Sequence, residues 1–412
     1  MVGAGRPLTG VRVLEVGIWH AGPGAASILG DLGADVIKVE TLSGDPERYF
    51  SAFNAMTDTT AHDTDDWTVM FELSNRNKRS ISVDLSSSRG RELFDSLLSS
   101  ADVFITNLRA PTVVKLGLDY ATLARLNPRL VHVNVTGFGS RGSKADAGAF
   151  DTLGQSVSGL MFLAGTDEPA PLNTMVCDQL TAIVASHAAI AALLSRELHG
   201  HGQDVHVSLY GAATWLTTAN LAFTSVRDAE IDLTWTRRSN CTLQSTFRCA
   251  DDEWIIGANV PEQPHWQRFC EAIDRPDLAQ DPQLATQEQR DGQRAHILGQ
   301  VDPVLAARSR GQWLQQFSDA GLMFAPVNRF QDVLADPQAQ ENEFVTAVQH
   351  RELGRVVLPG FPARFGQAVA GPGSPAPRFG EHTVEIAREA GLSADEVDAL
   401  VADGVLKTAS AR

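Results

Sequence analysis

Short buried strands alternate with helical patterns along the first half of the chain, and this alternation constrains the possible folds most strongly. Runs of Val, Ile and Leu predict the strands, and apolar residues at helical spacing separate them. The predicted strands cover residues 11–16, 36–39, 81–85, 103–106, 131–135 and 205–209. Strands and helices that alternate over short connections form a parallel sheet, with ligands at the carboxyl ends of its strands. We therefore predict an α/β fold.

Residues 7–40 form the clearest β-loop-α-β unit, with a helix predicted at 25–32. The turn before that helix contains Gly22-Pro23-Gly24, so a dinucleotide-binding fold is one hypothesis. The match to G-x-G-x-x-G is weak, because the glycines start late after the strand and the pattern ends in Ser27. An ordinary strand-to-helix turn explains most of the pattern. The remaining feature is a helix N-terminus suited to an anion.

Polar residues and glycines follow several of the strands. Gly17, Asn107 and Gly137 each stand at the carboxyl end of a predicted strand, so we expect them around one pocket. Segment 74–80 carries three cations and two asparagines at a strand entry, and it is either a phosphate cradle or a solvated turn. Residues 44–72 hold several aspartates and are predicted to form a solvated loop.

The composition limits the partners. The chain has 412 residues, of which 43% are hydrophobic, and a formal net charge of −16. This acidity argues against nucleic-acid binding, but it permits a small anionic ligand, because charge is screened over about 8 Å at physiological salt. The cysteines include no closely spaced pair, and no signal peptide is evident. We therefore expect the protein to be located in a reducing cytoplasm, and we expect no metal site. The longest apolar run, residues 181–194, is too short to span a membrane.

A change of composition marks a second domain. Residues 223–330 combine a short strand at 254–258 with several helical segments, which predicts a smaller α+β domain inserted into the first. The large domain is predicted to comprise residues 1–222 and 331–412. A chain of this length is expected to form about two domains.

Asp178 stands immediately before a long Ala/Leu/Ile helical run that ends at Gly200. The simple interpretation is a helix N-cap, which would contribute about 1 kcal/mol. The alternative uses the same position. A carboxylate near a helix N-terminus stays ionised, and an ionised carboxylate in a pocket can act as a covalent nucleophile. Asp178 taken alone favours capping, so the choice depends on the rest of the chain.

Several sequence blocks occur in the order typical of one protein family. They are Val13-Leu14-Glu15-Val16, Ala21-Gly22-Pro23, residues 32–40, residues 75–80, Leu116-Gly117, residues 126–130, Gly137-Phe138-Gly139, residues 200–207, Ala325-Pro326-Val327 and Gly380-Glu381-His382-Thr383. In these blocks the chain resembles the family III CoA-transferases over nearly its whole length. The resemblance implies a cytoplasmic homodimer of two interlocked, ring-like subunits, each with a Rossmann-like large domain and a small inserted domain. The family's catalytic aspartate precedes a long Ala-rich helix, and Asp178 matches that position.

The resemblance also implies a reaction. The Asp178 carboxylate would attack an acyl-CoA thioester and release CoA thiolate, which leaves a mixed anhydride on the side chain. The thiolate would return to form an aspartyl-CoA thioester and free the donor acid, and the acceptor carboxylate would repeat these steps in reverse. Acyl-CoA is then a substrate, and no tightly bound cofactor is expected. The chain also contains no G-x-x-x-x-G-K-[ST] nucleotide loop.

Other site residues are carried over from the family by position. Trp19, His20 and Ala21 match the family's loop near the pantetheine and the reacting thioester, and His20 stands where many members have glutamine. Either side chain can polarise a carbonyl, and a turn histidine with satisfied hydrogen bonds is the plainer alternative. The residues expected to contact CoA, directly or through its phosphates, are Lys38, Arg79, Val83, Asn107, Leu108, Arg109, Lys115 and Gly137.

Two other classes of function are weighed against CoA transfer. The related α-methylacyl-CoA racemases need two proton shuttles and carry a histidine before an aspartate; the matching pair here is Phe150-Asp151, and phenylalanine cannot carry a proton. Glu262 is the candidate for the second acid or base on that hypothesis. A non-catalytic acyl-CoA binder is disfavoured because Asp178 is present. Cys177 is better explained as a small packed residue than as a thiol nucleophile.

Overall fold

The chain divides into two compact units. The computed structural model describes residues 5–50, 68–163, 168–227, 237, 241–351, 354–366 and 368–409. The first unit comprises Met1–Met161, Pro171–Ala229 and Gln340–Arg412, and the second comprises Phe162–Ala170 and Glu230–Ala339. The main insertion therefore begins and ends somewhat later along the chain than the predicted 223–330.

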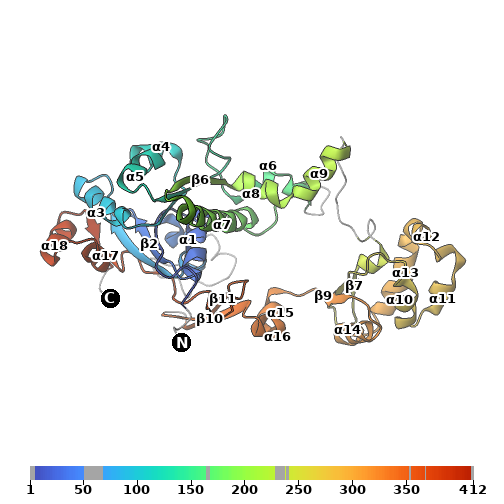
Figure 1. Cartoon of the computed structure of the whole chain (residues 1–412). Helices are drawn as coiled ribbons and strands as arrows, with labels where there is room; N and C mark the ends of the chain where they lie inside the picture. The colour runs from blue at the N-terminus through green and yellow to red at the C-terminus, as the bar shows by residue number, and fades with distance from the viewer. Residues whose placement is uncertain are drawn as a thin grey trace. The chain divides into compact units, whose positions relative to one another are not determined.

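The first unit is built on a seven-stranded, mostly parallel sheet (Figure 1). The strand order is β12-β3-β2-β1-β4-β5-β6, and only β12 runs antiparallel to its neighbour within this described sheet. The strands are β1 Arg12–Val16, β2 Asp35–Glu40, β3 Lys78–Val83, β4 Val103–Thr106, β5 Val131–Thr136, β6 Gln203–Ser208 and β12 Leu406–Lys407. The predicted α/β class is confirmed. The strand order reverses between β1 and β4, where α/β folds bind ligands at the carboxyl edge.

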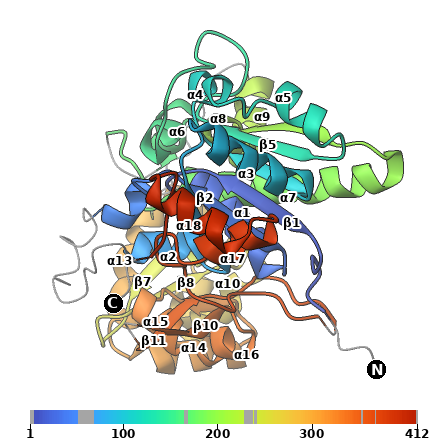
Figure 2. The same cartoon turned by 90° about the vertical axis from the view of Figure 1, so that its left-hand side faces the viewer.

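Helices cover both faces of this sheet, because successive strand residues point to opposite sides. Leu14 and Ile37 pack with α3, α5, α17 and α18, whereas Val13 and Val36 pack with α1 and α7. Figure 2 shows α3, α17 and α18 together on one side. The helices of this unit are α1 Ala21–Asp31, α2 Val69–Asn75, α3 Ser88–Ser99, α4 Ala110–Lys115, α5 Tyr120–Leu126, α6 Asp151–Val157, α7 Val176–His199, α8 Leu209–Leu216, α9 Thr218–Arg227, α17 Thr383–Glu389 and α18 Ala394–Ala402.

Helices α1 and α7 pack closely through small side chains. A Cβ atom added at Gly24 would lie 3.1 Å from the Cβ of Ala182, so the glycine permits the approach. Ala25 of α1 and Ala185 of α7 are fully buried in the same cluster. Helix α1 begins at Ala21, four residues earlier than predicted, and includes the Gly-Pro-Gly turn. This packing brings the N-terminal ends of both helices together.

Helix α7 is longer than the apolar run suggested. It has 24 residues and, in the described parts of the chain, it is the one helix long and apolar enough to cross a membrane. The helix extends beyond the apolar run 181–194 at both ends. Its alanine face is nevertheless buried against α1 and the sheet, which is the position of a core helix.

The predicted loop at 44–72 is only partly correct. Residues 51–67, with most of the aspartates, lie outside the described residues. The described parts contain a 3₁₀ turn at Pro46–Tyr49 and helix α2, which Thr68 caps by accepting the N–H of Phe71. A hairpin of β10 Val345–His350 and β11 Gly354–Pro359 also belongs to the first unit.

The second unit is a small α+β structure with its own core. Strands β7 Thr246–Arg248, β8 Trp254–Gly257 and β9 Phe324–Pro326 form an antiparallel sheet. Stacked rings of Trp313, Phe317 and Phe324 fill the core. The helices are α10 Trp266–Ala272, α11 Pro276–Gln280, α12 Gln287–Gly292, α13 Arg294–Leu305, α14 Arg310–Asp319 and α15 Phe330–Ala335; α16 Pro337–Glu341 follows at its boundary.

Candidate active site

Asp178 lies inside the first turn of α7, not at its N-cap as predicted. The helix begins at Val176, and the first-turn amides are satisfied from another helix. Asp151, the first residue of α6, accepts the N–H of Cys177 at 2.7 Å and the N–H of Asp178 at 3.0 Å through one oxygen. Gln155 donates to its other oxygen at 2.6 Å. The carboxylate that caps α7 is thus Asp151, and the Asp178 carboxylate is left without a capping role.

Burial and the neighbouring Asp151 carboxylate make Asp178 more basic than an ordinary aspartate. Burial, followed by the negative charge of Asp151, raises the pKa of Asp178 to about 7. The prediction that the helix terminus keeps this group strongly ionised is therefore wrong in direction, because Asp151 already occupies the amides. A carboxylate with a pKa near 7 ionises within the physiological range and is a stronger base than an ordinary aspartate. Such a shifted group in a functional site is a candidate nucleophile or base.

His20 connects the start of α1 to the start of α7. Its Nε2 atom lies 2.7 Å from Oε1 of Gln179, the residue after Asp178, and its Nδ1 atom lies 2.8 Å from Oγ of Ser74. Burial lowers the pKa of His20 to about 4, so the ring is neutral at pH 7. A neutral imidazole donates from one nitrogen and accepts at the other. The two hydrogen bonds agree with the interpretation of His20 as a turn histidine with satisfied partners. Polarisation of a carbonyl by His20 stays a prediction.

Trp19 holds the loop before His20 in a strained conformation. Its φ of 61° lies in the left-handed region, which a bulky residue rarely adopts. Its N–H donates to Asp45 at 3.2 Å, and its ring meets the edges of Phe50 and Phe150 at centroid distances of 5.2 and 5.7 Å. Backbone strain of this kind persists where the surroundings impose it, commonly at functional sites.

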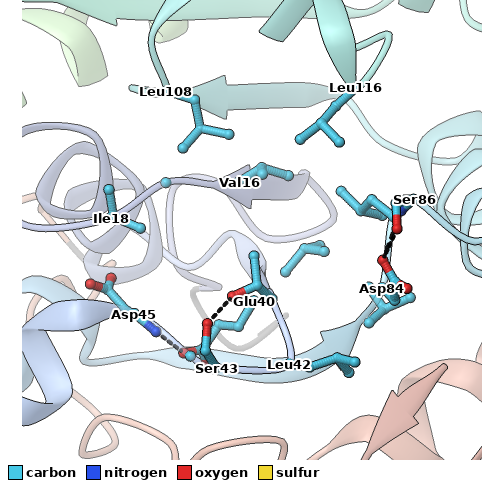
Figure 3. Close-up of a pocket in the computed structure, with 16 residues that line it drawn as sticks. Val16, Ile18, Glu40, Leu42, Ser43, Asp45, Asp84, Ser86, Leu108 and Leu116 are labelled. Carbon is cyan, nitrogen blue, oxygen red and sulfur yellow. Dashed lines mark hydrogen bonds between the residues drawn. The ribbon is translucent and has the colours of Figure 1, made fainter. Parts of the chain in front are cut away.

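A cavity of about 530 Å³ opens at the reversal of strand order between β1 and β4 (Figure 3). Val83 and Leu108, both predicted to contact CoA, line it, and so does Gly17. Figure 3 shows Leu108 and Leu116 on one side of Val16. The remaining lining residues are Ile18, Val39, Glu40, Thr41, Leu42, Ser43, Gly44, Asp45, Asp84, Leu85 and Ser86. The described lining thus contains carboxylates and hydroxyls but no cation.

Asn107 and Gly137 shape the loops around this edge of the sheet. Asn107 accepts the N–H of Ile18 at 2.9 Å and donates to its carbonyl at 2.6 Å, so it braces the loop between β1 and α1. A Cβ atom added at Gly137 would lie 2.5 Å from the Cβ of Ala149, which shows how closely the segment after β5 is packed. Neither residue is among those that line the cavity.

The family model for CoA-transferase family III matches residues 8–383. The chain belongs to CoA-transferase family III. A succinyl-CoA:glutarate CoA-transferase of Mus musculus is 28% identical over 407 residues, which cover 98% of this chain and 91% of the relative. A succinyl-CoA:mesaconate CoA-transferase of Haloarcula hispanica is 31% identical over 401 residues, covering 93% and 96%. A CaiB/BaiF family crystal structure from Brucella suis aligns with a TM-score of 0.83 at 27% identity, covering 94% of this chain and 100% of that one.

In this family III chain, Lys38 does not have the position that was predicted for a CoA contact. Its side chain is fully buried, and its ammonium group pairs with Glu15 at 3.0 Å and with Asp45 at 2.9 Å. Lys78 pairs with the other oxygen of Glu15 at 2.6 Å. The two ammonium groups therefore neutralise carboxylates inside the unit. The prediction that Lys38 contacts CoA is wrong, because its charge is already paired.

The other predicted cations occupy different surroundings. Arg79 pairs with Asp35 and Glu389, each at 2.8 Å, near the amino end of β2 and away from the cavity, so the prediction for Arg79 is also wrong in place. Arg109 is exposed at the N-cap of α4, and Lys115 is exposed in the last turn of that helix. Neither of these two side chains pairs with a carboxylate among the described residues, and both stay predictions as phosphate contacts.

Glu262, the racemase candidate, is not available as an acid or base in this family III chain. It is fully buried, pairs with Arg290 at 2.6 Å and accepts the N–H of Leu243 at 3.0 Å. Phe150, in contrast, is 62% exposed. The two residues that a racemase would use as proton shuttles are thus an apolar ring and an internal ion-pair carboxylate.

The sequence did not predict a role for three residues that are linked to His20 by hydrogen bonds. Gln179 and Ser74 contact its ring, and Glu47 contacts Ser74. Ser74 Oγ lies 3.2 Å from Glu47 Oε1, and burial together with Asp45 raises the pKa of Glu47 to about 8. The only sequence signal was the polar residue Ser74 at the edge of the cationic segment 74–80. Its partner Glu47 belongs to a segment that was predicted to be a solvated loop.

Proposed function

We propose that this chain transfers CoA from an acyl-CoA donor to a carboxylic acid acceptor, with Asp178 as the covalent nucleophile. The observation that carries the proposal is the half-buried Asp178 carboxylate beside Asp151, with a pKa raised to about 7. Membership of family III and relatives named CoA-transferases support the reaction class. Succinyl-CoA and the dicarboxylates in those names belong to the relatives.

The proposed reaction proceeds by exchange of bonds at one carboxylate. An Asp178 oxygen attacks the thioester carbonyl, the C–S bond breaks, and CoA leaves as a thiolate while a mixed anhydride forms. The thiolate attacks the aspartyl carbonyl, the donor acid leaves as a carboxylate, and an aspartyl-CoA thioester remains. An acceptor carboxylate then repeats both exchanges in reverse and restores Asp178. The raised pKa of Asp178 favours the first attack, because nucleophilicity increases with basicity.

CoA is proposed to lie in the cavity at the carboxyl ends of the strands. Apolar walls from Val83, Leu108 and Leu116 suit the pantetheine arm. The loop after β1 continues from Ile18 in this lining to His20, which contacts Gln179, the residue after Asp178. Ala21, the first residue of α1, is buried behind that loop. Since the described lining lacks cations, the phosphates are proposed to extend toward exposed Arg109 and Lys115. CoA acts as a substrate in this scheme, and no resident cofactor is required.

A cytoplasmic, interlocked homodimer is proposed from the family resemblance. The outward face of α7 supports coverage by another chain, because Ile183 is 48% exposed and Leu194 is 63% exposed. These side chains line an apolar cavity of about 730 Å³ together with Phe344 and Phe361. Analytical ultracentrifugation measures the oligomeric state directly.

Chemical trapping tests the proposed nucleophile. Hydroxylamine or borohydride, added during turnover with an acyl-CoA and a carboxylic acid, is expected to mark Asp178, as read by peptide mass spectrometry. Asp178→Asn is expected to fold and to lose transfer by orders of magnitude. Cys177→Ala is the matched control, since burial raises the pKa of the Cys177 thiol to about 12 and removes the reactive thiolate. A label on another residue would contradict the proposal.

Exchange in deuterated water separates transfer from racemisation. A chiral 2-methylacyl-CoA is incubated without any acceptor acid, and mass spectrometry follows deuterium at the α-carbon. We expect no incorporation, because Phe150 and the paired Glu262 supply no proton shuttle. Incorporation would favour the racemase hypothesis.

A further inference from the structure

A chain of hydrogen bonds runs from the start of α7 into the interior of the first unit. Its four members are Gln179, His20, Ser74 and Glu47. His20 Nε2 lies 2.7 Å from Gln179 Oε1, and His20 Nδ1 lies 2.8 Å from Ser74 Oγ. Ser74 Oγ in turn lies 3.2 Å from Glu47 Oε1. The three inner members are buried, whereas Gln179 is exposed directly after Asp178.

The number of hydrogens limits the arrangements of this chain. The Ser74 hydroxyl has one hydrogen, and a neutral imidazole has one N–H. When Glu47 is a neutral acid whose proton lies on Oε1, the oxygen next to Ser74, it donates to Ser74. Ser74 then donates to Nδ1 of His20, and Nε2–H of His20 donates to Gln179. The oxygen of Gln179 is then fixed by His20. Its NH₂ group has no hydrogen-bond partner among the described residues. The Gln179 side chain lines the apolar cavity of about 730 Å³ beside Ile183, so a substrate would meet this group from that cavity.

Ionisation of Glu47 reverses every one of these bonds. A carboxylate only accepts, so Ser74 donates to Glu47, and Nδ1–H of His20 donates to Ser74. His20 Nε2 becomes an acceptor, and half a turn of the Gln179 carboxamide brings its NH₂ group onto Nε2. Gln179 then presents its oxygen outward. A thioester carbonyl that becomes an oxyanion needs a donor, so only the arrangement with neutral Glu47 stabilises it.

We propose that Glu47 is a positioning residue that acts through Ser74 and His20 to make Gln179 present its N–H group to the reacting acyl oxygen. This inference rests on the proposed CoA transfer at Asp178, because it assigns a role within that reaction.

The charges around Glu47 favour the neutral acid. Burial and the charge of Asp45, which accepts the N–H of Glu47 at 3.0 Å, raise the pKa of Glu47 to about 8. The hydrogen bond with Ser74 opposes this shift, and so do the charges of Lys38 and Lys78, although both ammonium groups are paired with Glu15. Glu47 Oε2 is buried and has no hydrogen-bond partner among the described residues, an arrangement that a charged carboxylate would make costly.

The pH dependence of kcat in the full-length protein tests this role. For wild type we expect kcat to fall about a hundredfold above pH of about 8, the scale for loss of one oxyanion donor. In Glu47→Gln the amide donates to Ser74 at every pH. The fall of kcat above pH of about 8, the basic limb of the profile, is therefore expected to disappear. Ser74→Ala disconnects Glu47 from His20 and is also expected to lose the limb. Asp395→Asn, an exposed change on α18, keeps the wild-type profile. An unchanged basic limb in Glu47→Gln would overturn the proposal.

Nitrogen-15 NMR of the histidine rings shows which nitrogen of His20 carries the proton. It therefore tests the same series of hydrogen bonds without an activity measurement. His20 is identified among the 11 histidines by the signal lost in His20→Gln. Its proton is expected on Nε2 at pH of about 6.5 and on Nδ1 at pH of about 9.5, and on Nε2 at both in Glu47→Gln. A wild-type tautomer that does not change with pH overturns the proposal. A tautomer change in a protein that transfers no CoA supports the hydrogen-bond chain and overturns the proposed reaction instead.

Discussion

The backbone N–H of Asp178 donates to the carboxylate of Asp151 at 3.0 Å. One group therefore caps the helix that carries the proposed nucleophile and also places a negative charge beside it. Capping stabilises the fold, whereas the like charge raises the pKa of Asp178. These two effects can be separated, because an asparagine can keep the cap without the charge.

Asp151→Asn is expected to lower the pKa of Asp178 from about 7 toward the ordinary range. The asparagine oxygen still accepts both first-turn amides, but the repelling charge is gone; burial, the larger cause, keeps the pKa above its usual value. The acidic limb of kcat/KM is expected to move to lower pH. Asp151→Ala also loses the cap and is expected to cost a further ~1 kcal/mol in unfolding free energy. An acidic limb that stays in place or moves to higher pH would contradict this assignment.

Asp178→Asn is expected to raise the melting temperature above pH of about 7 while transfer is lost. The pKa of Asp178 is raised in the folded protein, so the unfolded chain ionises first as pH rises from about 4. The folded state loses relative stability until pH of about 7, and the penalty is constant above it. Removing the charge is expected to raise Tm by about 2–4 °C at pH of about 8. Calorimetry at pH of about 4, where the two proteins should match, is the control.

Gly24→Ala is expected to reduce both stability and transfer. The added Cβ atom would lie 3.1 Å from the Cβ of Ala182 and 3.2 Å from Nε2 of His20. Overpacking of this kind costs about 1–3 kcal/mol, and it displaces the imidazole from Gln179. The matched control is Gly299→Ala in α13, where an added Cβ meets nothing within 4 Å. That change is expected to stabilise the second unit by about 0.5–1 kcal/mol. Equal effects of the two changes in urea unfolding would argue against the close packing of α1 and α7.

Glu262→Gln is expected to destabilise the second unit by about 3–5 kcal/mol, because it leaves the Arg290 charge buried without its partner. Fluorescence of the buried Trp266 and Trp313 reports urea unfolding of this unit. Glu271→Gln, an exposed change in the same unit, is expected to alter stability by less than about 0.5 kcal/mol. A stable Glu262→Gln variant with altered α-proton exchange would restore the acid/base role of this residue.

Local sequence signals predicted the elements better than the contacts between them. The alternation of strands and helices led to the parallel sheet, and Gly200 ends α7 in the left-handed conformation expected of a glycine there. The start of α7 was misplaced because its cap comes from Asp151, far from Asp178 in sequence. An aspartate before an alanine run has the sequence pattern of an N-cap. That pattern cannot reveal a cap that another helix supplies.

Charged residues at strand ends were the least predictable part of the site. Lys38 and Arg79 have the sequence context of phosphate ligands, but each finds its carboxylates on other elements. The choice between a phosphate and a carboxylate partner depends on which strands become neighbours, and this is a property of the sheet order. Glu47 was missed for the same reason, since a carboxyl group in an acidic segment gives no sign that it is buried against Ser74.

Strand β12 closes the sheet next to β3, with Leu406 paired to Val83 in the antiparallel sense. The other six strands of this sheet precede the main insertion, Glu230–Ala339, in the chain, but β12 follows it. During synthesis on the ribosome, β3 therefore keeps an open edge while the whole insertion is being translated. An open edge of this kind is a template for pairing with other nascent chains. The order of translation therefore delays the pairing that covers this part of the β3 edge until β12 has been made.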